Sequence, residues 1–102
     1  MTIRFSSFAP ENLAWPMRIS VELTLTPLQD NFEPPIINFI KKLRASGLRV
    51  LENPLSTQVY GDYDRVMDIL QTEIKEAFEN VEHVVLGMKI VKSDRSTYEP
   101  HF

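Results

Sequence analysis

The sequence predicts a small α+β domain in which one antiparallel sheet is covered on one face by two helices. Three features point to this fold: a strictly alternating run that begins at residue 19, two stretches with apolar residues at helical spacing, and three further short runs typical of strands. With 102 residues, the chain has room for one hydrophobic core and therefore for one such domain.

The first strand is expected over residues 19–26, where apolar and polar residues alternate. Such alternation is typical of a strand with one buried face and one open face. We expect Pro27 to end this strand. The apolar side comprises Ile19, Val21, Leu23 and Leu25, and the polar side comprises Ser20, Glu22, Thr24 and Thr26.

A first helix is expected after the Pro34-Pro35 pair, which suits the first turn of a helix. Its apolar residues recur at helical spacing, and Gly47 supplies a left-handed stop. These apolar residues are Ile36, Ile37, Phe39, Ile40 and Leu43.

A hairpin and a second helix follow. Two strands are expected over residues 48–52 and 55–60, joined by a turn at Asn53-Pro54. Gly61 and Asp62 would end the second strand, with Asp62 as the N-cap of the helix. A last strand is expected over residues 83–92. The apolar stripe of the second helix, expected to be core, comprises Tyr63, Val66, Met67, Leu70, Ile74, Ala77 and Phe78.

This order of elements fits a ferredoxin-like βαββαβ fold, with the first and third strands in the centre of a four-stranded antiparallel sheet. Both helices would cover one face, which leaves the other face to solvent, a ligand or another subunit. Val85 and Val91 share that open face, which favours a homodimer or homotetramer. The polar residues expected there are Ser20, Glu22, Thr24, Ser56, Gln58, Tyr60, His83 and Lys89.

Residues 1–17 are expected to form an N-terminal extension to a domain of residues 18–102, because no sustained periodicity precedes the first strand. The extension lacks the order of charged, apolar and small residues that marks a signal peptide. No stretch approaches the ~20 apolar residues of a membrane helix. We therefore expect a cytoplasmic protein with no membrane span, and the absence of cysteine fits a reducing compartment.

Charge and composition exclude several classes of function. The 11 Lys and Arg residues and 14 Asp and Glu residues give a net charge of −3, and neither sign forms a long run, so nucleic acid is not an expected partner. The lack of cysteine excludes disulfides and thiolate catalysis. With only His83 and His101 as histidines, no metal site is indicated, and we expect no cofactor.

The stretch from Ser20 to Asp68 resembles the YkoF-like thiamine/hydroxymethylpyrimidine-binding family, and the likeness extends over about residues 18–92. Two segments are distinctive together: a loop after the first strand and the start of the third strand. Longer family members resemble two such domains in tandem, so pairing of subunits would replace the missing repeat here. The matching residues are Leu25-Thr26-Pro27-Leu28-Gln29-Asp30-Asn31-Phe32, Leu55-Ser56-Thr57, Val59, Gly61-Asp62, Val66-Met67, His83-Val84-Val85, Met88 and Ile90.

The resemblance implies reversible, non-catalytic binding of thiamine or its pyrimidine precursor, in vitamin uptake or salvage. Such a ligand needs paired polar groups, a ring to stack on and negative charge. Asp30 would accept from the exocyclic amine and balance the cation, and Asn31 offers a donor and an acceptor in the same loop. Phe32 or Tyr60 would stack, and Glu22 is a second candidate anion. Ser56 and Thr57 point to opposite faces, so we expect at most one of them to line a pocket on a given side.

Plainer interpretations stand beside these. Asp30 and Asn31 also suit an ordinary turn and helix cap, Ser56 and Thr57 suit any strand, and His83 is typical of a surface residue. One rival function is an enzyme acting on a small heterocycle, with Asp30 or Glu22 as general base, although no nucleophile stands at a related position. Another is an oligomeric regulatory or structural protein whose open sheet face is only a subunit interface.

Overall fold

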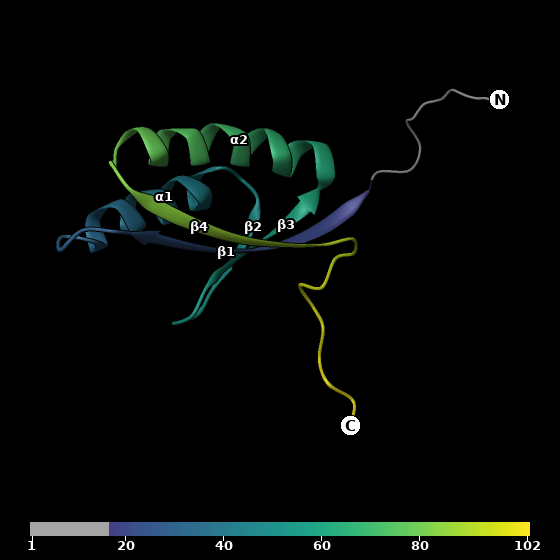
Figure 1. Ribbon diagram of the computed structural model, residues 1–102. Coiled ribbons are helices and arrows are strands. Elements are labelled where there is room, and N and C mark those ends of the chain that lie inside the picture. The colour runs from purple at the N-terminus through teal and green to yellow at the C-terminus, as the bar shows by residue number, and fades with distance from the viewer. Residues whose placement is uncertain (1–16) are drawn as a thin grey trace.

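The computed structural model describes residues 17–102 and contains four strands and two helices in the predicted order (Figure 1). The strands form one antiparallel sheet in the order β2-β3-β1-β4, and both helices lie on one face. The predicted ferredoxin-like fold, with the first and third strands central, is confirmed. The elements are β1 (Arg18–Pro27), α1 (Glu33–Ala45), β2 (Arg49–Glu52), β3 (Thr57–Asp62), α2 (Tyr63–Glu79) and β4 (Val84–Val91).

The core lies between the sheet and the two helices. Ile19, Val21 and Leu23 of β1 are at most 2% exposed, because their side chains point toward α1 and α2. Opposite them on the same face, Val59 of β3 is fully buried, and Leu43 of α1 is fully buried above the sheet. The predicted alternation of β1 is therefore confirmed, and it fixes which side of the sheet stays open.

Both helices begin and end close to the predicted residues. Pro34 and Pro35 lie in the first turn of α1, and Gly47 follows its end with φ +87°, a left-handed conformation that favours glycine. Asp62 is the N-cap residue of α2 by position, but its side chain makes no capping hydrogen bond. The carboxylate of Asp62 pairs instead with Arg18, at 3.3 Å.

Three apolar residues of the predicted helical stripes are exposed, and two of them, Tyr63 and Phe78, were expected to be core. Ile37 is 49% exposed because it follows Ile36 by one residue, about 100° around the helix from the buried stripe. Tyr63 and Phe78 are 42% and 45% exposed. They occupy the first and last turns of α2, where fewer neighbours surround a side chain. The middle of the stripe is packed as predicted, with Val66 and Leu70 buried.

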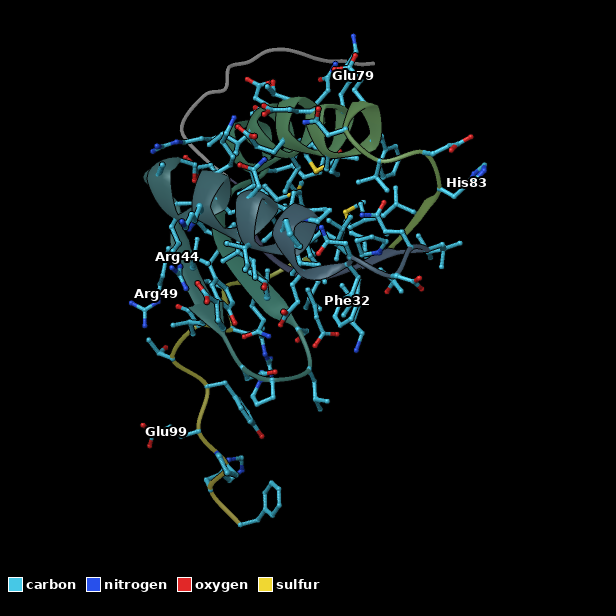
Figure 2. The ribbon with its side chains drawn as sticks, turned by 90° about the vertical axis from the view of Figure 1, so that its left-hand side faces the viewer. Phe32, Arg44, Arg49, Glu79, His83 and Glu99 are labelled. Atoms are coloured by element: carbon cyan, nitrogen blue, oxygen red, sulfur yellow. The ribbon has the colours of Figure 1, made fainter. Side chains whose placement is uncertain are left out.

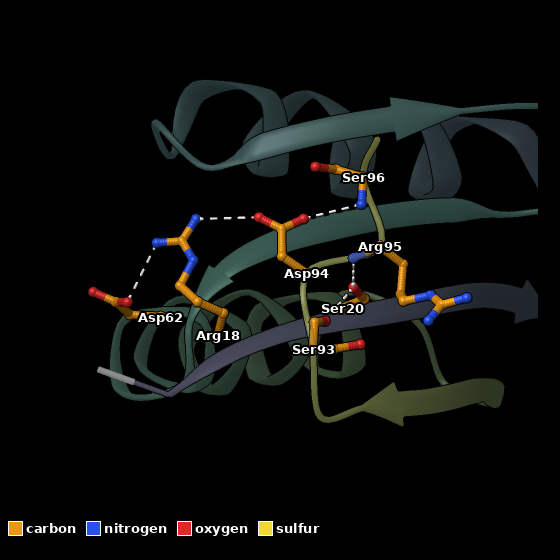
Figure 3. A network of polar contacts seen from close by, with 7 residues as sticks. All are labelled: Arg18, Ser20, Asp62, Ser93, Asp94, Arg95 and Ser96. Atoms are coloured by element: carbon orange, nitrogen blue, oxygen red, sulfur yellow. Dashed lines mark hydrogen bonds and ion pairs between the residues drawn. The ribbon is translucent and has the colours of Figure 1, made fainter. Parts of the chain in front are cut away.

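The C-terminal segment, residues 92–102, first turns back across one end of the open face, through Ser93 and Arg95, and then extends away from the sheet (Figure 1, Figure 3). The Ser20 hydroxyl donates to the Ser93 carbonyl at 2.7 Å and accepts from the Arg95 N–H at 2.8 Å, and Ser20 is 8% exposed. Hydrogen bonds from Ser96, together with the nearby Arg18, hold the pKa of Asp94 below its usual range. The chain therefore covers one end of its own open face.

The predicted N-terminal extension, residues 1–17, falls outside the described residues except for Met17. The Met17 carbonyl accepts a hydrogen bond from the Tyr63 N–H at 2.7 Å, which continues the pairing of β1 with β3 by one position. The division of the chain into an extension and a domain stays a prediction.

Candidate functional site

A cleft opens where β3 stops short of the end of β1. We name it the hairpin cleft, because the turn between β2 and β3 forms one of its walls and the first half of α1 forms another. Its volume is about 310 Å³, at the lower end of the range of small-molecule sites. In Figure 1 the β2–β3 hairpin bends away from the helices. The lining residues are Leu23, Thr24, Leu25, Thr26, Ile36, Ile40, Asn53, Pro54, Leu55, Ser56 and Thr57.

The backbone of Leu25 gives this cleft an open strand edge. Backbone groups of successive strand residues point to alternate sides. Leu28 donates its N–H to the His83 carbonyl on the β4 side at 2.9 Å, so odd-numbered residues of β1 direct their N–H and C=O toward β3. The pairing of β1 with β3 ends at Leu23 and Thr57. Leu25, the next odd residue, therefore presents both groups beyond the end of β3.

The neighbouring residues keep this edge open. By register, Leu55 would lie opposite Leu25, but it belongs to the turn, where its N–H bonds to the Asn53 side chain at 2.8 Å. Pro27 follows on the same edge and has no N–H to satisfy, which is why a proline is tolerated in the last position of β1. The strand ends at Pro27, as predicted, with Pro27 itself as its last residue.

A second, smaller concavity lies on the open face of the sheet. We name it the sheet hollow; its volume is about 160 Å³. It contains one carboxylate, from Glu22, and two cationic side chains, from Lys89 and Arg95. Arg95 belongs to the C-terminal segment and lies over the Tyr98 ring, 4.7 Å from its centre. The lining residues are Ser20, Val21, Glu22, Gln58, Tyr60, Lys89, Val91 and Arg95.

A short chain of hydrogen bonds joins the two concavities. The Ser56 hydroxyl donates to Glu22 Oε2 at 2.9 Å, and Gln58 Nε2 donates to the Ser56 Oγ at 2.6 Å. Lys89 Nζ lies 3.7 Å from Glu22 Oε1. Glu22 pairs across the sheet with both Gln58 and Lys89, which explains why these side chains meet. Ser56 lines the hairpin cleft, whereas its two partners, Glu22 and Gln58, line the sheet hollow.

The structure divides the predicted site residues among three places. Ser56 and Thr57 line the hairpin cleft, and Glu22 and Tyr60 line the sheet hollow. The expectation that only one of Ser56 and Thr57 lines a given pocket was wrong. The cleft lies at the beginning of β3, beyond its pairing with β1, so residues of both faces reach it. Tyr60, predicted to lie on the open face, does so by its register with Ser20 but is only 9% exposed.

The loop residues Asp30, Asn31 and Phe32 line neither concavity. All three are exposed, Phe32 by 51%. The Gln29 side chain donates to the Asn31 carbonyl at 2.6 Å, which shapes the loop locally. Figure 2 shows Phe32 and, at the margin of the molecule, His83, which is exposed as expected of a surface residue.

Sequence reasoning did not identify several lining groups. Ile36 and Ile40 were predicted only as apolar residues of the first helix, but they are partly buried and form the apolar wall of the hairpin cleft. Arg95 follows the last predicted strand, residues 83–92, and was not among the predicted site residues. The backbone edge at Leu25 has one signal in the sequence, because Pro27 on the same edge is typical of a position without a strand partner.

Among residues 17–102, no three histidine or acidic side chains gather closely enough to hold a metal ion. Neither helix of the described chain combines the length and the apolar character required to cross a bilayer.

Comparison with solved structures supports the fold. A Streptococcus pneumoniae protein superposes with a TM-score of 0.73 at 23% identity, over 79% of this chain and 92% of that one. A Thermotoga maritima protein, provisionally assigned to thiamine biosynthesis or salvage, gives 0.66 at 20% identity, over 72% and 81%. A Bacillus cereus domain of unknown function gives 0.67 at 16% identity, over 81% and 83%. At these identities the likeness establishes the fold alone.

Sequence comparison identifies the family. No curated protein matches the chain. The family profile described as thiamine-binding protein matches residues 21–100, which include both helices, nearly the whole sheet and both concavities except for Ser20. The resemblance seen in the loop after β1 and in the start of β3 is thereby confirmed, and the chain belongs to the thiamine-binding protein family.

Proposed function

We propose that this protein binds thiamine or its hydroxymethylpyrimidine precursor reversibly, without chemical change, and that the aminopyrimidine ring occupies the hairpin cleft. A role in vitamin uptake or salvage follows from such binding. The observation that carries the proposal is the open strand edge at Leu25. Membership of the thiamine-binding family supplies the class of ligand.

The edge of Leu25 complements an aminopyrimidine. The ligand presents a ring nitrogen that accepts and an exocyclic amine that donates, side by side. Leu25 presents an N–H and a C=O on the same side of β1. The N–H can donate to the ring nitrogen and the C=O can accept from the amine, so the ligand is bound without any charged group. Because Leu25 is only 9% exposed, its backbone groups gain from a partner that replaces water.

The walls of the cleft suit a flat, weakly polar ring. Ile36 and Ile40 of α1 supply apolar surface, and the polar residues Thr24, Thr26 and Thr57 line the same space. We further propose that Asp30 lies near the cationic thiazolium of thiamine, with Asn31 and Phe32 beside it. The support is positional, since this loop joins Thr26 to the helix that carries Ile36.

Binding without catalysis is supported by the surroundings of the two candidate carboxylates, Glu22 and Asp30. Glu22 accepts a hydrogen bond from Ser56 and faces Lys89, which suits a fixed acceptor better than a base that must exchange protons with a substrate. Asp30 lies exposed in its loop. Neither arrangement supports the rival enzyme with Asp30 or Glu22 as general base.

We also propose a homodimer or homotetramer in the cytoplasm. Val85 and Val91 on the open side of β4 are 54% and 39% exposed, and Met88 and Ile90 on its other side are each 44% exposed. Strand β4 lies at the edge of the sheet, where a second subunit would cover these side chains. The rival view, in which the open face is only a subunit interface, must accommodate the C-terminal segment that already covers part of it.

Amide exchange tests the site directly. The chain of residues 1–102 is titrated with hydroxymethylpyrimidine and with thiamine by calorimetry, and we expect a Kd of about 1 μM or below for at least one of them. NMR-detected hydrogen exchange then follows individual amides. Saturation with the bound ligand should slow exchange at Leu25, whereas Leu23, already paired with Thr57, serves as the matched control and should change little.

A variant completes the test. Ile40→Trp fills the cleft from α1 and should weaken binding at least tenfold, while His83→Ala at the far margin should leave the Kd unchanged. No saturable heat with either ligand would refute the proposed function. Heat without protection of the Leu25 amide would place the ligand elsewhere on the protein.

A further inference from the structure

The hydrogen-bonding state of Ser56 is fixed by its two neighbours. Glu22 is a carboxylate and can only accept, so the 2.9 Å contact uses the single hydrogen of the Ser56 hydroxyl. Gln58 donates its amide hydrogen at 2.6 Å and occupies one of the two lone pairs of Ser56 Oγ. If the Gln58 amide were turned around, its oxygen and the Glu22 carboxylate would both need the single hydrogen of the Ser56 hydroxyl. Ser56 therefore has one lone pair left and no hydrogen to offer.

Glu22 is held in place from both sides. Its other carboxylate oxygen lies 3.7 Å from Lys89, and the pairing of β1 with β3 and β4 places Gln58 and Lys89 directly across from it. The Glu22 side chain is 45% exposed, so it is reached from solvent on the open face, whereas Ser56 is half-buried. The carboxylate thus acts on the hairpin cleft only through Ser56.

We propose that Glu22 is a positioning residue that makes Ser56 an obligate acceptor, and that this arrangement selects 4-aminopyrimidines over 4-oxopyrimidines. The inference rests on the proposed function. An amine has two hydrogens, one for the Leu25 carbonyl and one for the Ser56 Oγ, and both residues line the cleft. An oxo group in the same place would face two acceptors and find no donor.

The cost of the oxo group gives the expected selectivity. Loss of a hydrogen bond together with an unpaired polar group weakens binding by roughly 10- to 100-fold. Sites that hydrogen-bond a substrate group discriminate strongly against analogues that lack it, because the polar groups of the site are left unpaired. The 4-amino ligand should therefore bind more tightly by about this factor.

Two ligands and three variants test the inference. The probes are 4-amino-5-hydroxymethyl-2-methylpyrimidine and its 4-oxo counterpart, and the readout is the ratio of their Kd values by calorimetry. In Glu22→Gln, the amide donates to Ser56 and frees its hydroxyl hydrogen for the cleft. The ratio should then fall about tenfold. Ser56→Ala should also lower the ratio, and Glu79→Gln, an exposed matched control on α2, should leave it unchanged.

The ratio of the two Kd values distinguishes a positioning role of Glu22 from a merely structural one, because a general loss of packing would weaken the binding of both ligands by the same factor. A ratio in Glu22→Gln equal to that of the unmodified protein would overturn the inference. Equal binding of the two probes to the unmodified protein would also overturn it, while leaving the proposed function intact. Binding of neither probe would overturn both.

Discussion

Replacing Ser20 by alanine should loosen the C-terminal segment from the open face. Ser20 is 8% exposed, and its hydroxyl makes two hydrogen bonds to that segment, one to the Ser93 carbonyl at 2.7 Å and one from the Arg95 N–H at 2.8 Å. In Ser20→Ala both backbone groups lose this partner. Each bond contributes about 0.5–1.5 kcal/mol net, so the free energy of unfolding should fall by about 1–3 kcal/mol.

The expected loss is at the lower part of this range, because the freed segment can move away and let water hydrate both groups. For a domain of this size each kcal/mol corresponds to roughly 4–8 °C in the midpoint of thermal unfolding. Urea unfolding of Ser20→Ala and of the unmodified protein, followed by circular dichroism, measures the difference.

A truncated chain ending at Lys92 supplies the control. Without residues 93–102, the Ser20 hydroxyl has only water as partner on the open face, and Ser20→Ala should cost less than about 0.5 kcal/mol there. The difference between the two backgrounds is the coupling energy of Ser20 with the C-terminal segment. An equal loss in both backgrounds would refute the reasoning, since it would show that Ser20 stabilises the sheet and not the segment.

Two further predictions concern single positions. A Cβ at Gly87 would lie 2.6 Å from Thr24 Oγ1, so Gly87→Ala should destabilise by about 1–3 kcal/mol in urea unfolding, and Thr24→Ala should restore most of the loss. A full loss persisting in the double variant would contradict this clash. The hydrogen bond from Arg44 holds the pKa of Glu52 below its ordinary value. A lowered folded-state pKa stabilises the protein above the unfolded-state pKa, and this stability is lost as pH falls through the folded-state value. Glu52→Gln should therefore flatten the acid side of the stability profile slightly, and an unchanged profile would contradict this role of Glu52.

The β1 strand and the open face were predictable because their signal is local. Alternation from Ile19 to Thr26 fixes which side chains are buried, and β-sheet geometry then fixes the faces of the residues across from them. The loop after β1 and the start of β3 carried the family resemblance for the same reason. These features depend on spacing along the chain alone.

The exposure of Tyr63 and Phe78 was not predictable in this way. Their helical spacing matches that of Val66 and Leu70, and only the position of α2 over the sheet decides which turns are covered. The placement of the C-terminal segment was equally hidden. Ser20 could be assigned to the open face, but nothing in the pattern showed that Ser93 and Arg95 return to it.

The sequence by itself determined the fold class, the open face and the family, because periodicity and motif spacing depend on neighbours in the chain. Only the tertiary structure decided which candidate residues meet. Ser56 and Thr57 converge on the hairpin cleft, Glu22 reaches it through Ser56, and Asp30 lies apart in its loop. The physical reason is the length of β3. Its pairing with β1 ends at the pair Leu23 and Thr57, which leaves the backbone of Leu25 without a strand partner. The turn between β2 and β3 decides where this pairing ends, and the alternating pattern of β1 contains no signal for it.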